Sequence, residues 1–251
     1  MKNIIEVIYK DYRRQHLYIG KLAGKEYGPF PSVSSIKGVV DKSGPLIIWA
    51  RREALKLAKT ELIAYLSENQ AIDEGALDEI LKRADREPDR IKDEAGDIGT
   101  RVHNAIDLHI MGQEPALDEV TRQGYTNFLA WLKNAGITLL KGDTPLVSLK
   151  YGFGGRADAY GKDRDGNFVL LDWKTSNGIY DDFAYQTGGY SLATRETLDE
   201  EPKRAFVVRF GKNKPDVEAR ELNLQESEQC FLACLALYKC IKGKTKLEVW
   251  K

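Results

Sequence analysis

The spacing of hydrophobic positions changes near residue 137 and divides the chain into a helical first half and a strand-rich second half. In residues 48–66, Leu55, Ala58, Leu62 and Leu66 recur at helical spacing, which predicts an amphipathic helix. Three more helices are expected before residue 137, at 74–85, 89–111 and 118–135.

The helix at 118–135 has the clearest predicted orientation. Four of its apolar side chains are expected to point inward: Val120, Phe128, Leu129 and Leu132. Gly136 is its expected C-terminal stop. Before all of these helices, residues 3–30 are predicted as short strands with a turn near Ala23 and Gly24, and the serines of PSVSSIKGVV are expected to start a short helix.

The second half alternates between apolar and polar positions, which is typical of strands. PLVSLKY, GRADAYG and NFVLLDWK are separated by turn residues, and DRDGN at 163–167 signals a hairpin. A helix is expected at 181–196, followed by the strands RAFVVRF and VEARELNL and a last helix at 224–241. The order predicts an α+β (mixed α/β) fold in one domain over 1–251, with a mainly helical part at 1–136 and a β-meander core with a C-terminal helix at 137–251.

Composition adds little to this picture. The 251 residues suit one sizeable domain, and 42% apolar with 30% charged residues is ordinary for a soluble globular protein. No apolar run approaches the roughly 20 residues needed to cross a bilayer. The start MKNIIEVIYKDYRRQ turns charged too soon for a signal peptide, so we expect an intracellular (cytoplasmic) protein.

The three cysteines, Cys230, Cys234 and Cys240, are an odd number in a chain without a secretion signal, which argues against a disulfide framework. An iron–sulfur cluster normally needs four thiolates, so none is expected. Cys230 and Cys234 lie in the apolar helix ESEQCFLACLALYKC, which favours buried structural cysteines.

The segment DWK carries the first candidate chemistry. Residues two apart in a strand share a face, so Asp172 and Lys174 project together while Trp173 points away. The carboxylate can hold a divalent cation, and the lysine can orient an attacking water and offset negative charge. A structural ion pair at a strand end is the alternative interpretation.

Asp158 lies on the strand before the DRDGN turn. If 155–161 pairs with 167–174 across that turn, Asp158 lies roughly opposite Asp172 or Lys174, and the two aspartates can share one metal ion. Two aspartates with a backbone carbonyl suit Mg²⁺, which prefers hard oxygen ligands. A plain turn residue is the alternative for Asp158.

The helix before the sheet carries Gly99, His103 and Asp107, spaced by four so that they share one face. The absent side chain at Gly99 would let a strand or a phosphate backbone come close. An imidazole at His103 would favour Mn²⁺ more than an all-oxygen site does. A structural histidine and a solvated or supporting Asp107 are the alternatives.

Gln186 and Tyr190 also share a helix face, just after DWKTS, and both can hydrogen-bond phosphate or support the site. Gly188 and Gly189 between them weaken that helix, which suggests close approach by another backbone or a ligand, or simple packing. Trp131, Trp173 and Tyr185 are expected in the core rather than as platforms for bases.

Taken in order, these motifs resemble the RecB-like branch of the PD-(D/E)XK nuclease superfamily, which includes phage-type and mitochondrial genome-maintenance-type exonucleases. The motifs are G-x-x-x-H (Gly99 to His103), G-x-x-D (Gly155 to Asp158), D-x-K (Asp172 to Lys174) and Q-x-x-x-Y (Gln186 to Tyr190). PSVSSIKGVVDKSGPLIIWARREA also looks like the opening of such members, so the resemblance covers about residues 30–190.

The resemblance implies a restriction-endonuclease-like core and a role for each motif residue. Asp158 and Asp172 would bind Mg²⁺ or Mn²⁺ with help from the Trp173 carbonyl, and His103 would be a further ligand. Lys174 would be the catalytic lysine, and Gln186 and Tyr190 would support it or bind DNA. One departure is that relatives often carry a glutamate where this chain reads Leu146, Val147, Ser148, Leu149.

The resemblance implies hydrolysis of DNA phosphodiester bonds to leave 5′-phosphates, by an exonuclease of replication, recombination or repair, as in a phage-infected cell. An endonuclease on the same core and a DNA-binding protein without catalysis stay open. The net charge is zero, so DNA contact depends on local clusters. Arg51, Arg52 and Lys56 are the preferred DNA contacts, with an ordinary solvated face as the alternative.

Overall fold

The chain divides into two compact units. The computed structural model describes residues 5–12, 15–212 and 214–242. The sheet unit consists of Met1–Val40 and Gly99–Lys251, and the helical unit is Asp41–Ile98. The boundaries fall inside the part expected to be mainly helical (1–136), and the prediction that the whole chain acts as one domain stays a prediction.

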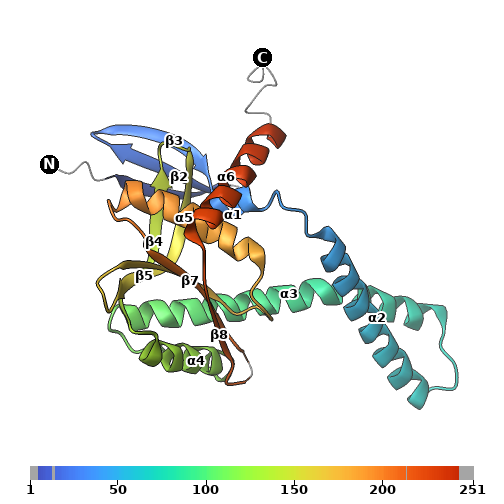
Figure 1. Cartoon of the computed structure of the whole chain (residues 1–251). Coiled ribbons are helices and arrows are strands. Elements are labelled where there is room, and N and C mark those ends of the chain that lie inside the picture. The colour runs from blue at the N-terminus through green and yellow to red at the C-terminus, as the bar shows by residue number, and fades with distance from the viewer. Residues whose placement is uncertain (1–4, 13–14, 213, 243–251) are drawn as a thin grey trace. The chain divides into compact units, whose positions relative to one another are not determined.

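A five-stranded sheet forms the centre of the sheet unit (Figure 1). Its strands lie in chain order: β4 Ile137–Ser148, β5 Phe153–Asp163, β6 Phe168–Lys174, β7 Arg204–Phe210 and β8 Val217–Glu221. Neighbours are antiparallel except β6 and β7, which are parallel. The expected meander is therefore wrong at this step, because a parallel pair needs a crossover, and α5 Asp181–Thr197 supplies it.

Helices cover both faces of this sheet, which confirms the α+β class with a mixed sheet flanked by helices. One apolar core joins the sheet to α1 Val33–Lys37, α5 and α6 Leu224–Ile241. A second core joins it to α4 Glu119–Ala135 and to the last turns of α3 Glu74–Ile110. Trp173 lies in the second core, buried against Phe128 and Trp131 as expected.

A small three-stranded sheet precedes α1. It consists of β1 Glu6–Tyr12, β2 Gln15–Leu22 and β3 Lys25–Pro31, and the turn at Ala23 and Gly24 has positive φ at both residues, as a tight hairpin requires. A bridge between Ser32 and Gly154 links its end to β5. Ser32 also caps α1, because its side chain accepts a hydrogen bond from the Ser35 N–H.

The helical unit contains α2 Ser43–Glu68 and the first turns of α3. Separate helices at 74–85 and 89–111 are wrong, because α3 continues through Pro88. A proline removes one hydrogen bond from a helix interior. Arg90 pairs with Glu87 at 2.7 Å and with Glu94 at 3.1 Å, and these contacts support the turns beside that proline.

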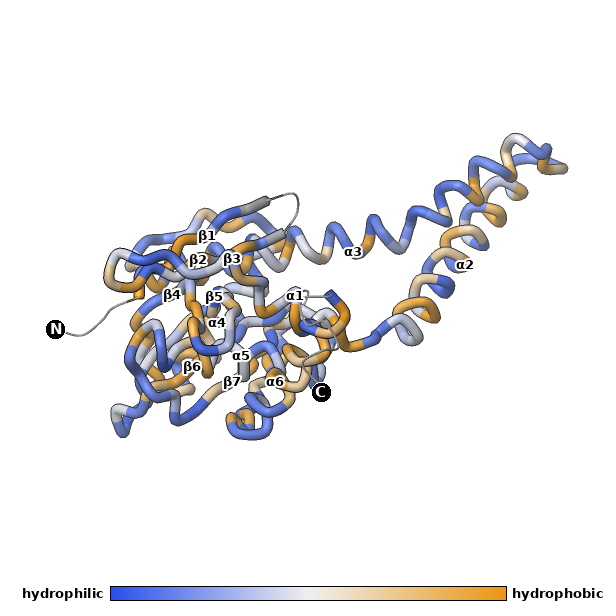
Figure 2. Tube along the Cα trace, turned by 90° about the horizontal axis from the view of Figure 1, so that it is seen from above, coloured by the Kyte–Doolittle hydropathy of each residue, from blue (hydrophilic) through white to orange (hydrophobic). Residues whose placement is uncertain are grey.

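Several apolar helix positions are more exposed than expected. On α2 only Ala58 is buried, while Leu55 is 63% and Leu66 49% exposed. Figure 2 shows hydrophobic patches recurring along this helix. On α4, Phe128 is buried as expected, but Val120 is 41% and Leu129 38% exposed. Helical spacing finds one apolar side of a helix, but it does not show how wide a stripe the neighbours cover.

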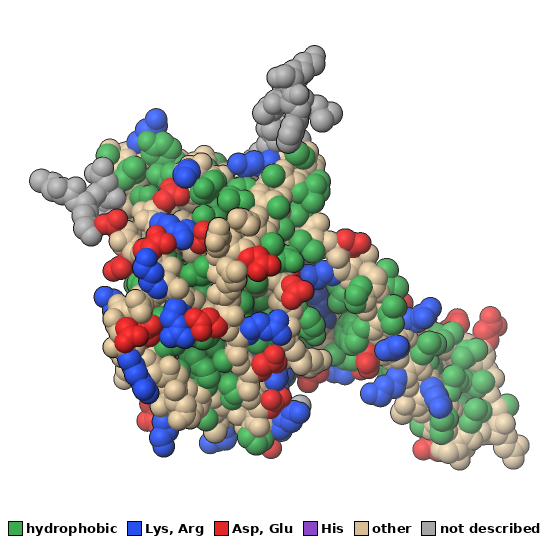
Figure 3. Space-filling view, in the orientation of Figure 1, with side chains coloured by type: hydrophobic (Ala, Val, Ile, Leu, Met, Phe, Trp, Pro, Cys, Tyr) green, Lys and Arg blue, Asp and Glu red, His purple; other side chains and the backbone are tan. Residues whose placement is uncertain are grey.

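Within the described residues, no helix is both long and apolar enough to cross a membrane. Acidic and basic side chains lie interspersed on the face drawn in Figure 3.

Candidate active site

The candidate site lies where strands β5 and β6 separate. Their antiparallel pairing, expected from the DRDGN turn, runs from Lys162↔Phe168 to Ala159↔Leu171. Beyond that point the Trp173 N–H donates to Oδ2 of Asp158 at 2.8 Å instead of to a strand carbonyl. The end of the ladder therefore fixes the Asp158 carboxylate against the residue between Asp172 and Lys174.

Asp172 and Lys174 project together from the end of β6, as the D-x-K spacing predicts. Asp172 is fully buried, and its Oδ2 lies 2.5 Å from Nζ of Lys174, whose side chain is 15% exposed. The Lys174 ammonium also lies over the Phe183 ring, 5.0 Å from its centre. The pair is held rigidly, because β6 is a central strand whose preceding residues are all buried.

Gln186 and Tyr190 reach the same place from α5. Nε2 of Gln186 donates to Oδ1 of Asp172 at 3.1 Å and to the Tyr190 hydroxyl at 2.9 Å. Gly155 makes room for the tyrosine, since a Cβ at that position would lie 2.7 Å from the Tyr190 ring. The G-x-x-D, D-x-K and Q-x-x-x-Y motifs are thus one connected cluster.

One face of α3 closes the other side. Nδ1 of His103 lies 3.6 Å from Oδ1 of Asp158. One turn earlier, a Cβ on Gly99 would lie 3.0 Å from Oγ1 of Thr175, so the glycine admits the end of strand β6. One turn later, Asp107 lies against Gly142 of β4. The shared face expected of these three residues is confirmed.

The two aspartates have opposite electrostatics. Burial raises the pKa of Asp172 to about 6, with the charge of Asp158 adding to the rise and Lys174 opposing it. Burial also acts to raise the pKa of Asp158, but His103, Lys174 and the Trp173 N–H outweigh it and lower that pKa. Asp158 is therefore stabilised as a carboxylate, whereas the charge of Asp172 depends on nearby positive groups.

The cationic groups respond to the same charges. Burial acts to lower the pKa of Lys174, but Asp172 and Asp158 outweigh it and raise that pKa. Burial likewise opposes the charged form of His103, and Asp158 outweighs it, so the pKa of His103 is raised. Burial, followed by the charge of Asp143, raises the pKa of Asp107 to about 6. The carboxylates of the site therefore favour the protonated forms of Lys174 and His103, while Asp172 and Asp107 resist ionisation.

This donor set fits a hard divalent cation. Mg²⁺ is commonly bound by one or two carboxylates and keeps several waters. Asp158 and Asp172 are such carboxylates, and the buried Asp172, with its raised pKa, is a group that an added positive charge would stabilise. Among the described residues, no three His, Cys, Asp or Glu side chains are grouped so that they could hold a metal by themselves. His103 as a further ligand stays a prediction.

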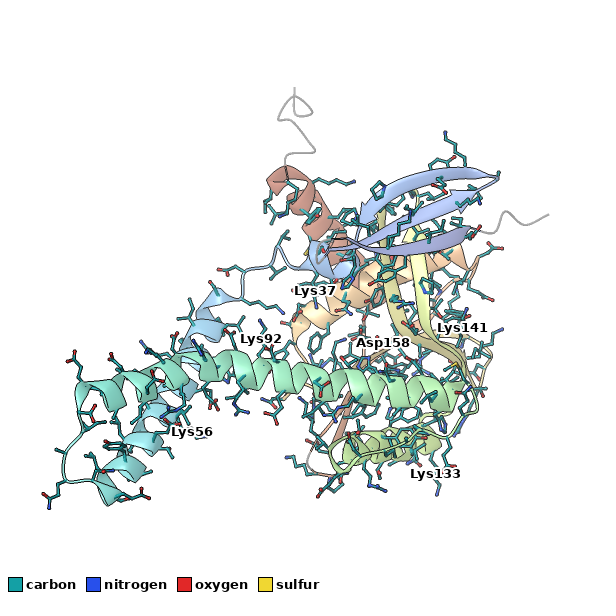
Figure 4. All side chains as sticks on the ribbon, turned by 180° about the vertical axis from the view of Figure 1, so that it is seen from behind. Lys37, Lys56, Lys92, Lys133, Lys141 and Asp158 are labelled. Atoms are coloured by element: carbon teal, nitrogen blue, oxygen red, sulfur yellow. The ribbon has the colours of Figure 1, made fainter. Side chains whose placement is uncertain are left out.

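Lys37 is a member of this cluster that the sequence analysis missed. It lies at the end of α1, and its Nζ is 2.8 Å from both Oε1 of Gln186 and Oδ2 of Asp182. Figure 4 labels Lys37 on α1 and Asp158 on β5. Burial is the main reason why the pKa of Lys37 is lowered. The only sequence signal was a lysine in the serine-rich helix PSVSSIKG, which by itself does not indicate a site.

The remaining candidate residues from the sequence lie on α2 and α5. Arg51, Arg52 and Lys56 lie on α2 in the helical unit, and their contact with DNA stays a prediction. Gly188 and Gly189 serve packing, because a Cβ on either would lie within 3 Å of Ser227 or Phe231 in α6.

The remaining expectations concern the cysteines and the missing glutamate. Cys234 is buried as expected, and Cys230 is half-buried. After the stretch Leu146 to Leu149, in which the resemblance implied a glutamate, the chain turns, and the backbone N–H groups of Leu149 and Lys150 donate to Glu196 of α5. That carboxylate holds the β4–β5 turn.

Comparison with known proteins gives a distant structural likeness. The sequence matches no protein-family profile and no curated protein. The structure is similar to one from Eubacterium rectale described as a candidate exonuclease, with 13% identity, a TM-score of 0.41, and coverage of 59% of this chain and 69% of that one. It is also similar to an alkaline exonuclease from Laribacter hongkongensis, with 13% identity, a TM-score of 0.32, and coverage of 58% and 84%.

Proposed function

We propose that this protein is a metal-dependent DNA nuclease that hydrolyses phosphodiester bonds and leaves 5′-phosphates. One observation carries the proposal: Asp158, Asp172 and Lys174 meet where β5 and β6 separate, and the two carboxylates have opposite pKa shifts. Carboxylates and a lysine fixed on rigid strands suit metal-assisted hydrolysis at a phosphate. The ordered motifs favour an exonuclease of replication, recombination or repair.

Asp158 and Asp172 would hold Mg²⁺ or Mn²⁺, together with the Trp173 carbonyl and, as a further ligand, His103. When bound, the cation would activate water and neutralise charge at the phosphate. His103, followed by Lys174 and the Trp173 N–H, lowers the pKa of Asp158 and keeps it ionised, and the Trp173 N–H also holds the carboxylate in place. Gln186 keeps Asp172 in place through its 3.1 Å hydrogen bond.

Lys174 is the residue proposed to act on the reacting atoms. Its ammonium is fixed between Asp172 and the Phe183 ring, so it is oriented before substrate arrives. In that position it can orient the attacking water and offset the negative charge that develops on the phosphate. The same contacts hold it charged, because two carboxylates raise its pKa. Lys174 is therefore assigned to orientation and charge stabilisation.

Digestion of end-labelled single- and double-stranded DNA tests the proposal. The purified chain is incubated with Mg²⁺, with Mn²⁺ or with a chelator, and closed circular DNA is the control. An exonuclease degrades linear DNA and spares the circle. Cutting of the circle would favour the endonuclease alternative. Absence of cleavage with either metal, together with retained DNA binding, would favour a binding protein without catalysis.

A further inference from the structure

Lys37 is fixed in place by the packing of its own short helix. Val33 and Ile36 of α1 are fully buried in the core beside α5 and α6. Ser32 caps the helix and bridges to Gly154 of β5, so the N-terminal end of this segment is tied to the sheet unit. The Lys37 side chain is only 16% exposed, and it extends toward α5.

The side chain of Lys37 contacts three residues of one helix, α5. Its Nζ lies 2.8 Å from Oε1 of Gln186 and 2.8 Å from Oδ2 of Asp182. It also lies over the Phe183 ring, 5.5 Å from the ring centre. Asp182 is 4% exposed, so this ion pair is largely shielded from solvent. Lys37 therefore ties α1 to the part of α5 that faces the candidate active site.

The contact with Gln186 determines which way its amide points. A primary amide has an oxygen that accepts and a nitrogen that donates, whereas a lysine ammonium only donates. The oxygen faces Lys37, so the nitrogen faces Asp172 Oδ1 and the Tyr190 hydroxyl. The reversed amide would place its oxygen against the Asp172 carboxylate and its N–H groups against the ammonium.

We propose that Lys37 is a positioning residue for the active site: it fixes the amide of Gln186 so that an N–H donor always faces Asp172. The effect on catalysis rests on the proposed nuclease function. Lys37 acts through Gln186 and makes no contact with substrate. Direct contact with a DNA phosphate is a competing role, and the experiments separate the two.

The first test reads the Gln186 amide itself and needs no enzymatic activity. The side-chain amide signals of Gln186 are assigned in a ¹⁵N–¹H spectrum by their loss in Gln186→Leu. In Lys37→Met they should move toward the positions of exposed glutamines and exchange faster with solvent. Unchanged Gln186 signals in Lys37→Met would overturn the proposal, whether or not the chain cleaves DNA.

The second test is a double-mutant cycle on DNA cleavage. Lys37→Met should lower kcat about tenfold with little change in KM, because a misplaced supporting group weakens the transition state more than binding. In the Gln186→Leu background the same substitution should have almost no further effect. A full tenfold loss in that background, or a rise in KM that depends on salt, would overturn the proposal in favour of direct phosphate contact.

Three further variants control for loss of structure. Lys37→Arg retains a donor for Gln186 and should recover most of kcat; no recovery in a folded Lys37→Arg protein counts against the proposal. Lys239→Met is the matched control, because Lys239 lies on α6 and donates to the Tyr151 carbonyl at 3.1 Å. It should leave both the amide signals and kcat unchanged. If Lys37→Met unfolds, the double variant Lys37→Met with Asp182→Asn takes its place in both tests, because it also removes the buried charge of Asp182, and the same results support or overturn the proposal.

Discussion

The two carboxylates of the candidate site are held in different ways. Asp158 accepts a backbone N–H at 2.8 Å and has the His103 ring 3.6 Å away, and its pKa is lowered. Asp172 is fully buried with the Lys174 ammonium at 2.5 Å and the Gln186 amide at 3.1 Å, and its pKa is raised to about 6. Burial opposes ionisation of both carboxyl groups. Only at Asp158 do the neighbouring groups outweigh burial, so only the pKa of Asp158 is lowered.

The difference assigns the two sides of the site different tasks. When the environments of two acids separate their pKa values, the acids can take separate roles. In the proposed mechanism, Asp158 would bind the cation without a change in its protonation. The ionised form of Asp172 would be stabilised most by an added positive charge. Without a cation, Lys174 and Gln186, which is itself hydrogen-bonded to Lys37, hold the Asp172 carboxylate in place. Substitutions on each side of the site should therefore have different effects.

Removing Lys174, the partner of Asp172, should have the largest effect on DNA cleavage. Lys174→Ala should lower DNA cleavage by roughly 10³-fold or more, because the variant loses the charged group proposed to stabilise the reacting phosphate. Binding of DNA should persist. Single-turnover cleavage and a gel-shift titration measure the two quantities.

Lys141→Ala, at an exposed lysine of β4, is the control and should cleave like the wild type. The melting temperature of Lys174→Ala must be followed as well, because a buried Asp172 without its partner costs several kcal/mol of stability. Activity within a few-fold of the wild type would remove Lys174 from the mechanism.

On the other side of the site, Asp158→Asn should weaken metal binding at least tenfold, because it replaces an ionised ligand by a neutral one. Calorimetric titration with Mn²⁺ is the measurement. Asp165→Asn, in the exposed turn after β5, should bind Mn²⁺ like the wild type. Equal Mn²⁺ affinities of the wild type, Asp158→Asn and Asp165→Asn would show that Asp158 is not a metal ligand.

The sequence predicts much of this site, because local rules place its members. The D-x-K spacing puts Asp172 and Lys174 on one side of β6, and the DRDGN turn sets the register that brings Asp158 to them. Spacing by four aligns Gly99 with His103 on α3. These relations depend on neighbours along the chain or across one hairpin.

What the sequence misses depends on tertiary packing. Lys37 is 149 positions from Gln186 and meets it only because α1 packs on α5. The parallel pairing of β6 with β7 likewise depends on where α5 crosses. The sequence predicts separate helices at 74–85 and 89–111, yet one helix, α3, continues through Pro88. None of these outcomes leaves a periodic signal in the residues concerned.

His103 should affect the binding of Mn²⁺ and Mg²⁺ to different degrees. If its imidazole becomes a ligand, His103→Leu should lower affinity for Mn²⁺ several-fold more than affinity for Mg²⁺, because imidazole is the softer donor. Parallel titrations with both ions give the ratio. An equal loss for both ions would mean that His103 only supports Asp158, the contact seen at 3.6 Å.

The smallest effect is expected for substitution of Asp107, which lies one turn after His103 on α3. Its pKa of about 6 lies above the value of an unfolded chain, so its ionisation destabilises the folded state as pH rises from about 4 to about 6. Asp107→Asn should therefore gain about 1–2 kcal/mol in unfolding free energy at pH 7.5 and nothing at pH 4.

Urea unfolding at both pH values measures this difference. Asp143→Asn, at the half-exposed aspartate nearby, is the comparison and should gain less. A gain for Asp107→Asn that is equal at both pH values would show that charge is not its cause.

Hydrolysis of linear DNA in H₂¹⁸O tests the central claim most directly. With Mg²⁺ or Mn²⁺, the wild-type chain should release products that carry one ¹⁸O atom in a 5′-phosphate, as seen by mass spectrometry, and Lys174→Ala should release almost none. Products formed in the presence of a chelator, label in a 3′-phosphate, or no product with either metal would contradict the account.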